Sequence, residues 1–227
     1  MKFEYYLFDL DNCILLFNEP EIYFGQLFSL TMEYFANIIP NQEELNKMLS
    51  SSNINRFIEQ YWKIKNVNKF WRHFKNLDIQ KREELIDKGK ISLDPTAIMV
   101  IKKLKKANKK IGLVTNSPSY IVEMLTQKFN LSVIFDEIFS IDYDNNPTFA
   151  KPSSEGINYV LSSFKSNKRD CKAIMIGDSE VDIRAAKKAN IFACLITKEV
   201  ITKNLDFTSW KEKPDYIIHN FTELLTL

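Results

Sequence analysis

Two pairs of aspartates are the first groups in this 227-residue sequence that could do chemistry. Asp9 and Asp11 follow the apolar run 5–8, and Asp178 and Asp182 follow a second apolar run. Side chains two residues apart in an extended chain face the same side, so both members of the first pair can point into one pocket. Turn or helix capping also explains each pair taken alone. Four carboxylates at one sheet edge, however, repel one another without a cation, so the pattern predicts an oxygen-liganded Mg²⁺ site.

Three further polar residues accompany predicted strands and helices. Thr115 and Asn116 end a third apolar run, and their hydroxyl, amide and backbone N–H groups suit a phosphate. An ordinary polar turn explains the same two residues equally well. Lys151 stands in a loop before a predicted helix, where a lysine by itself is typical of solvated surface. The residues alone therefore leave these three positions open.

The positions of these polar groups depend on predicted strands. The runs with strand composition are residues 5–8, 110–114, 173–176, 192–196 and 216–218. The first three end abruptly in polar residues. Because ligands of open α/β sheets bind outside the carboxyl ends of the strands, we expect these three ends to form one site.

Helical patterns alternate with the strands from about residue 92 onward. Asp94-Pro95 is an N-cap followed by a first-turn proline, and Ser117-Pro118 repeats this arrangement ahead of a second helix predicted to start at Pro118. A third helix is predicted over 180–189. Such alternation favours an α/β fold, with a Rossmann-like parallel sheet as the core and helices on both faces.

Residues 17–90 lack strand-like alternation and space their apolar side chains as amphipathic helices do. Asn41 and Glu44 resemble a capping box. The apolar residues expected on one face of the helix that follows are Leu45, Met48 and Leu49. The predicted organisation is a core formed by residues 1–16 and 91–227, with an inserted all-helical module at 17–90.

Composition indicates a water-soluble globular protein with a real core, since 45% of the residues are hydrophobic and 26% are charged. The net charge of +2 is too small to recruit nucleic acid or an acidic membrane. The lysines around residues 102–110 are explained better as the solvated face of a helix. No apolar run approaches the ~20 residues that cross a bilayer. We therefore expect neither a nucleic-acid nor a membrane partner.

The three cysteines, Cys13, Cys171 and Cys194, have no CxxC or Cys/His spacing. This argues against a disulfide framework and against a structural zinc site. Acidic residues appear within the first eleven positions, before an apolar stretch of signal-peptide length can develop. Reduced thiols and the lack of an export signal predict a cytoplasmic protein.

Four short motifs, taken together and in order, resemble those of the haloacid dehalogenase-like hydrolases. They are Asp9-Leu10-Asp11-Asn12-Cys13, Thr115-Asn116, Lys151-Pro152 and Gly177-Asp178-Ser179-x-x-Asp182. The resemblance extends over about residues 3–197, and the helical module has the place and length of the cap in one branch of that family. Cys13 stands where Thr or Val is usual and keeps their bulk. Asn190 stands where glycine is common and tolerates the same left-handed C-cap.

The resemblance implies a covalent mechanism. Asp9 matches the nucleophile that becomes an aspartyl-phosphate, and Asp11 matches the general acid and base. The residues that match phosphate-binding groups are Thr115, Asn116 and Lys151. The implied Mg²⁺ ligands are the Asp9 carboxylate, the Asp11 backbone carbonyl and Asp178, with Asp182 either a ligand or a support behind them.

The implied function is a Mg²⁺-dependent phosphatase that hydrolyses a small phosphorylated metabolite, as phosphoglycolate phosphatase-like and pyrimidine nucleotidase-like members do. Asp11 favours phosphoryl chemistry, because the dehalogenase branch of the family lacks this aspartate and the metal. A phosphoglucomutase-like phosphotransferase uses the same motifs and stays an alternative, as does a non-catalytic binding protein on the same fold. The oligomeric state is left open.

Substrate choice would reside in the helical module. The side chains that could bind an anion or stack on a base are Arg56, Trp62, Lys63, Lys65, Trp71, Arg72 and His73. Each of them is also typical of the surface or core of a helical bundle.

Overall fold

The computed structural model describes residues 2–17, 20–36, 40–41, 43–44, 47, 54–142, 147–164, 172–197 and 209–227. The chain divides into two compact units. The first unit consists of Met1–Leu16 and Ser92–Leu227, and the second, the helical unit, consists of Phe17–Ile91. Four residues named above lie outside the described ranges: Leu45, Met48, Leu49 and Cys171.

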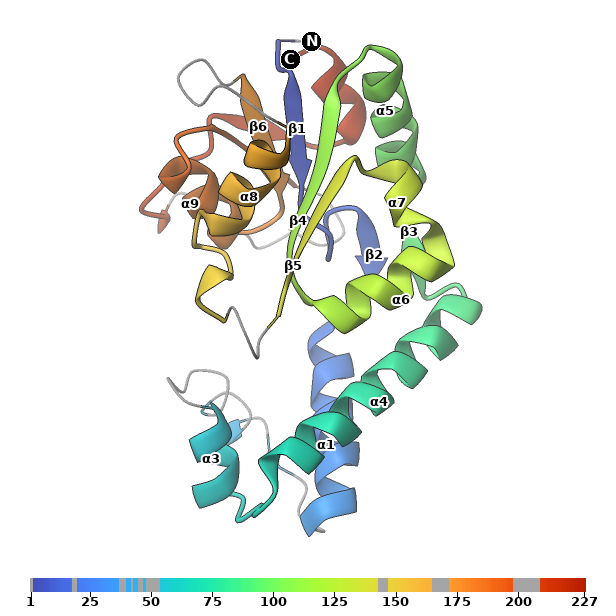
Figure 1. The fold of residues 1–227 in the computed structure, drawn as a ribbon, viewed down its shortest axis with the longest axis vertical. Helices are drawn as coiled ribbons and strands as arrows, with labels where there is room; N and C mark the ends of the chain where they lie inside the picture. The colour runs from blue at the N-terminus through green and yellow to red at the C-terminus, as the bar shows by residue number, and fades with distance from the viewer. Residues whose placement is uncertain are drawn as a thin grey trace. The chain divides into compact units, whose positions relative to one another are not determined.

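A six-stranded parallel sheet in the order β5-β4-β1-β6-β7-β8 forms the centre of the first unit (Figure 1). Its strands are β1 (Tyr5–Phe8), β4 (Lys110–Pro118), β5 (Glu137–Ile141), β6 (Ala173–Gly177), β7 (Phe192–Ile196) and β8 (Tyr216–Ile218). β1 lies between β4 and β6, where Phe8 is opposite Leu113 and Ile176. All five predicted strands are confirmed. Strand β5 was not predicted, because Glu137 and Ser140 interrupt its apolar run at the edge of the sheet.

Helices cover both faces of this sheet. They are α5 (Pro95–Lys106), α6 (Ser119–Phe129), α7 (Leu131–Ile134), α8 (Glu155–Ser163) and α9 (Glu180–Lys188), with 3₁₀ helices η1 (Pro147–Phe149) and η3 (Phe221–Leu225). Figure 1 shows α8 and α9 on one side of the sheet and α5 and α6 on the other. Strands covered on both faces are apolar along their whole length, which explains the sequences of β1 and β6. The predicted α/β fold with a Rossmann-like parallel sheet is confirmed.

The core between the sheet and helices α8 and α9 consists of aliphatic side chains. Leu7 and Met175 from the strands pack with Ile157, Val160 and Ile183 from the helices, and all five are buried. Burying one such side chain stabilises the fold by about 1.5–3 kcal/mol. This packing fixes α8 and α9 to the strands whose ends carry the polar residues of interest.

Two of the expected local signals are present at helix ends. Asp94 Oδ1 accepts hydrogen bonds from the N–H groups of Thr96 at 2.8 Å and Ala97 at 3.1 Å, so Asp94 is the N-cap of α5. Asn190 follows α9 with a φ of 56°, the left-handed conformation that asparagine tolerates. These two ends are therefore set by local sequence.

The helix predicted after Ser117-Pro118 is present as α6, but the predicted N-cap at Ser117 is wrong. Strand β4 continues through Pro118, and α6 begins at Ser119 without a side-chain cap. The reason is local, because a residue before proline is driven towards extended backbone, and Pro118 itself has a ψ of 147°. Ser117 therefore belongs to the strand, and its hydroxyl is available for a contact other than capping.

The helical unit contains α1 (Pro20–Ala36), α3 (Ile54–Gln60) and α4 (Val67–Asp87). Tyr23 on α1 donates to Asp78 Oδ1 on α4 at 2.5 Å, and Arg82 donates to the same oxygen at 2.9 Å. Asn41 and Glu44 exchange the two hydrogen bonds of a capping box, at 2.9 and 3.0 Å. Within the described residues, no helix is long and apolar enough to span a membrane.

Two short strands, β2 (Leu15–Phe17) and β3 (Ile91–Leu93), form a separate two-stranded sheet. They lie at the positions in the sequence where the chain passes between the two units. Neither strand is predicted from the sequence, because three residues are too few to show a period.

Two of the residues considered for substrate choice, Trp62 and Trp71, make contacts within the helical unit. Trp62 is 3% exposed and packs against the rings of Phe57 and Phe70. Trp71 Nε1 donates to Asn55 Oδ1 at 2.8 Å. Trp62 is thus a core residue of the helical unit.

Both cysteines in the described residues are buried free thiols, and burial raises the pKa of Cys194 to about 12. Cys13 Sγ lies 3.7 Å from the carbonyl oxygen of Ile176. Because the thiolate is the reactive form, folded protein at about pH 8 should protect both residues from iodoacetamide. Peptide mapping of native and denatured samples checks this. Alkylation of Cys194 at the same rate in both samples would contradict the structure.

Candidate active site

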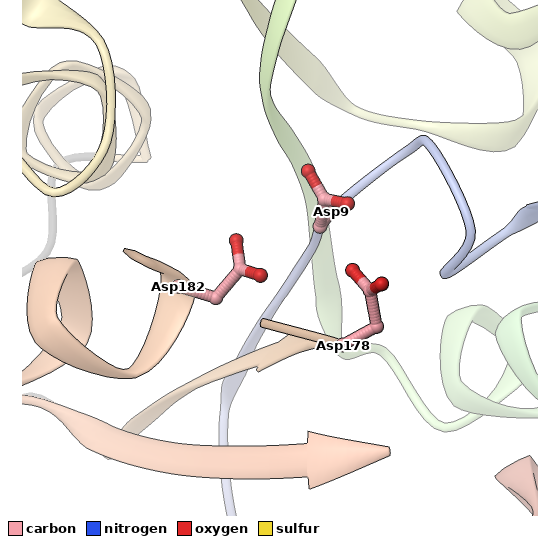
Figure 2. Close-up of side chains that lie close together, drawn as sticks. All are labelled: Asp9, Asp178 and Asp182. Carbon is pink, nitrogen blue, oxygen red and sulfur yellow. The ribbon is translucent and has the colours of Figure 1, made fainter. Parts of the chain in front are cut away.

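Three aspartates lie together at the carboxyl edge of the sheet. Asp9 follows β1, Asp178 follows β6, and Asp182 lies in the first turn of α9. Because β1 and β6 are neighbouring parallel strands, their ends bring the first two residues side by side. One carboxylate oxygen from each of the three lies within 4.8 Å of the others. Figure 2 shows the three carboxylates converging from these separate segments.

The ammonium group of Lys151 lies among these carboxylates. Lys151 precedes α8, and its Nζ donates to Asp9 Oδ1 and, at 2.6 Å, to Asp182 Oδ1. Its side chain is 4% exposed, so the expectation of a solvated lysine from this residue alone is wrong. A buried ammonium requires such partners, because an unpaired charge in the protein interior is strongly unfavourable.

Both oxygens of Asp182 have partners. Oδ1 accepts from Lys151, and Oδ2 accepts from Ser179 Oγ at 2.5 Å and from the Ser179 N–H at 3.1 Å. The contacts with Ser179 form a capping box at the start of α9, so the helix-capping explanation of Asp182 also holds. Gly177 permits the arrangement, because a Cβ there would overlap the Asp182 carboxyl group. Asp182 therefore caps α9 and pairs with Lys151 at the same time.

The charges of this cluster shift the pKa values of its members. Burial raises the pKa of Asp9 well above its usual range, against the attraction of Lys151, and Asp182 and Asp178 raise it further. Burial and then the charge of Asp182 raise the pKa of Asp178 to about 7. Burial lowers the pKa of Lys151, but Asp182 and Asp9 outweigh it, so the pKa is raised and the ammonium stays charged. One ammonium does not balance three carboxylates.

The donor set fits a hard divalent cation. Mg²⁺ is usually bound by one or two carboxylates together with water and substrate oxygens. Asp9 and Asp178 offer two carboxylates from neighbouring strands, whereas Asp182 already uses both of its oxygens. Within the part of the chain that the structure describes, this is the one cluster of three such side chains.

Thr115 and Asn116 lie in β4, beyond the residues that pair with β1. Thr115 is 1% exposed, and its Oγ1 accepts from the Ser117 N–H at 2.9 Å. Asn116 Oδ1 accepts from the Lys151 N–H at 2.7 Å, and Asn116 Nδ2 donates to the Lys151 carbonyl oxygen at 3.0 Å. The amide of Asn116 therefore holds the main chain of Lys151. By fixing this main chain, Asn116 helps to position the buried ammonium group.

Asp11 lies on the turn that follows β1. Asn12 has a φ of 59°, which reverses the chain there, and its N–H donates to the Leu15 carbonyl oxygen at 2.9 Å. Asp11 Oδ2 accepts a hydrogen bond from the hydroxyl of Ser117. Ser117 is a residue of this site that is not among those predicted from the sequence. Its position two residues after Thr115, on the same side of an extended strand, is the signal that could have found it.

One family model matches most of this chain. Residues 6–196 match the family described as haloacid dehalogenase-like hydrolase. This range contains all four motifs, from Asp9 to Asp182.

Individual relatives and solved structures agree with this match. The chain is 25% identical to pyrophosphatase PpaX of Bacillus mycoides, over 100% of this chain and 97% of that protein. It is 38% identical to phosphoglycolate phosphatase of Psychrobacter arcticus, over 40% of this chain and 37% of that protein. The crystal structure of CbbY from Rhodobacter sphaeroides in complex with phosphate has the same fold, with a TM-score of 0.70 at 21% identity over 98% of this chain and 96% of that one. The chain therefore belongs to the haloacid dehalogenase-like hydrolase family.

Proposed function

We propose that this phosphatase of the haloacid dehalogenase-like family hydrolyses a small phosphorylated metabolite with the help of Mg²⁺, through an aspartyl-phosphate on Asp9. The observation that carries the proposal is the buried contact between Asp9 and Lys151, beside Asp178. A carboxylate in this position can attack phosphorus, and the ammonium offsets the repulsion between that carboxylate and an anionic substrate.

In the first step, a carboxylate oxygen of Asp9 forms a bond to phosphorus while the bond from phosphorus to the leaving oxygen breaks. Lys151 and the hydroxyl of Thr115 bind the phosphoryl oxygens. Asp11 donates its proton to the leaving oxygen, so the product departs as a neutral alcohol. When bound by Asp9, Asp178 and the backbone carbonyl of Asp11, Mg²⁺ supplies positive charge at the phosphoryl oxygens.

In the second step, the aspartyl-phosphate is hydrolysed. Asp11, now a carboxylate, takes a proton from a water molecule while the water oxygen forms a bond to phosphorus. The bond between phosphorus and the Asp9 oxygen breaks, which releases phosphate and restores the Asp9 carboxylate. One ester and one water thus become one alcohol and one phosphate, with both aspartates returned to their starting states.

Inorganic pyrophosphate is a second candidate substrate beside phosphate monoesters. It is supported by the full-length similarity to a protein named pyrophosphatase, whereas the similarity to a protein named phosphoglycolate phosphatase covers a shorter stretch. The same two steps apply to pyrophosphate, with phosphate as the leaving group.

Phosphate release from a panel of compounds tests the proposed function. The panel contains pyrophosphate, phosphoglycolate, nucleoside monophosphates and sugar phosphates, each with Mg²⁺ and with Asp9→Asn as the blank. We expect one compound to be clearly preferred. Folded protein with bound Mg²⁺ that releases no phosphate from any of them would contradict a hydrolase. Transfer of the phosphoryl group between sugar phosphates would identify a phosphotransferase.

Removal of divalent ions should reduce turnover to the level of the blank, and Mg²⁺ should restore it. The reason is that Lys151 alone leaves the pKa values of Asp9 and Asp178 raised, and a divalent cation favours the ionised carboxylate that attacks phosphorus. Added Mg²⁺ should also raise the melting temperature of wild-type protein, because an ion that binds only the folded state stabilises it. Asp178→Asn should weaken both effects. Full activity in protein shown to be metal-free by elemental analysis would contradict a requirement for Mg²⁺ in the reaction.

A further inference from the structure

Ser117 is buried in the active site, with a role that the chemistry above leaves unassigned. It is 6% exposed. Its hydroxyl donates to Asp11 Oδ2, and its N–H donates to Thr115 Oγ1 at 2.9 Å. A single residue therefore contacts the carboxyl group proposed to move protons and the hydroxyl proposed to bind phosphate.

The length of β4 creates this contact. β1 ends at Phe8, which pairs with Leu113, whereas β4 continues to Pro118. The pairing of β4 with β5 shifts register between Val114 and Pro118, so this end of the strand departs from the regular ladder. The extension carries Ser117 to the turn that holds Asp11.

The backbone of that turn is held by its own hydrogen bonds. The N–H of Asn12 donates to the Leu15 carbonyl oxygen at 2.9 Å, and the N–H of Leu15 donates to the Leu10 carbonyl oxygen at 2.7 Å. These bonds fix the position of the Asp11 main chain, but they leave the rotation of its carboxyl group open. The hydroxyl of Ser117 restricts that rotation by binding one carboxylate oxygen.

We propose that Ser117 is a positioning residue, which holds Asp11 Oδ2 so that Asp11 Oδ1 exchanges the proton with the leaving oxygen and then with water. The proposal rests on the role of Asp11 in the proposed function. A general acid must lie within hydrogen-bonding reach of the atom that it protonates, and small errors in its orientation slow the reaction strongly. Ser117→Ala keeps the Asp11 carboxyl group but removes the hydroxyl that restricts its rotation.

Two substrates that differ in their leaving group separate this role from a general loss of structure. Phenyl phosphate has a poor leaving group, phenoxide, which needs a general acid to protonate it. p-Nitrophenyl phosphate has a similar shape, but its p-nitrophenoxide departs without a general acid. With enzyme in excess over substrate, release of the alcohol reports the first step alone. General acid catalysis contributes roughly 10²–10⁴-fold, so Ser117→Ala should slow phenol release by roughly 10–100-fold and p-nitrophenol release by much less.

The matched control is Ser163→Ala, which removes a serine hydroxyl at the end of α8. There Ser163 Oγ donates to the Val160 carbonyl oxygen at 2.8 Å. It should behave as wild type with both substrates. Inhibition by inorganic phosphate should be the same for Ser117→Ala and wild type, because the phosphate-binding groups are unchanged. Thermal unfolding verifies that each variant is folded at the assay temperature.

A double-mutant cycle shows whether Ser117 acts through Asp11. Asp11→Asn should give the same dependence on the leaving group, and adding Ser117→Ala to it should cause no further loss. Equal slowing of both substrates by Ser117→Ala, weaker inhibition by phosphate, or a loss that adds to that of Asp11→Asn would overturn the positioning role. Activity that survives in Asp9→Asn would instead overturn the proposed function itself.

Discussion

Asp9→Asn should abolish turnover and leave the fold intact. The amide has the shape of the carboxyl group and can still accept a hydrogen bond from Lys151, but it does not attack phosphorus. Removing a nucleophile lowers kcat by roughly 10⁴–10⁶-fold. Lys151 keeps its ion pair with Asp182 in this variant, so replacing the Asp9 carboxylate by a neutral amide should cost little stability. Phosphate release measures the loss of turnover, and thermal unfolding of the same preparation measures the stability.

The control for this variant is Asp87→Asn, at the exposed last residue of α4. It makes the same chemical change in the helical unit and should retain full activity. If Asp9→Asn turned substrate over at a rate within tenfold of wild type, the nucleophile would have to be another group.

Lys151→Met should have the second largest effect, on activity and on stability together. Methionine keeps most of the volume of the side chain but removes the ammonium that Asp9 and Asp182 share. Loss of one group that stabilises the transition state costs about 10²–10³-fold in kcat. Breaking a buried ion pair lowers the free energy of unfolding by about 3–5 kcal/mol.

Mg²⁺ separates the two consequences of Lys151→Met. A bound divalent cation offsets the repulsion among Asp9, Asp178 and Asp182, so Mg²⁺ should raise the melting temperature of this variant more than that of wild type. It should not restore the rate, because the contact of the lysine with the phosphoryl group is still missing. Weaker inhibition by inorganic phosphate would show that loss directly.

Lys105→Met is the matched control for this lysine. Lys105 pairs with Asp136 at 2.9 Å in a partly exposed position, so the same substitution there should cost less than about 1 kcal/mol and leave kcat unchanged. Wild-type inhibition by phosphate in Lys151→Met would place the lysine outside the phosphate site.

The sheet could be predicted from the sequence because its central strands are covered on both faces. Such strands are short apolar runs, and those at 5–8, 173–176 and 192–196 stand out from their polar surroundings. The start of α5 could be predicted equally well, since the side chain of Asp94 caps this helix. In each case a local signal and the tertiary structure agree.

The parts that could not be predicted depend on contacts between distant residues. Lys151 has the loop position of a surface residue, and its burial follows from Asp9 and Asp182, which come from other segments. The pairing of the Asn116 amide with the main chain of Lys151 leaves no trace in local sequence. Ser-Pro often begins helices, so the local sequence favours a helix cap at Ser117, and the continuation of β4 overrides that preference.

The most direct test of the account is to trap the phosphoryl group on the enzyme. Asp11→Asn lacks the proposed base for the second step, so with p-nitrophenyl phosphate and Mg²⁺ the phosphorylated enzyme should accumulate. Acid quenching followed by peptide mapping should then find one phosphoryl group per chain, on Asp9. Phosphorylation of any other residue, or p-nitrophenol released by this variant without label on the protein, would contradict the account.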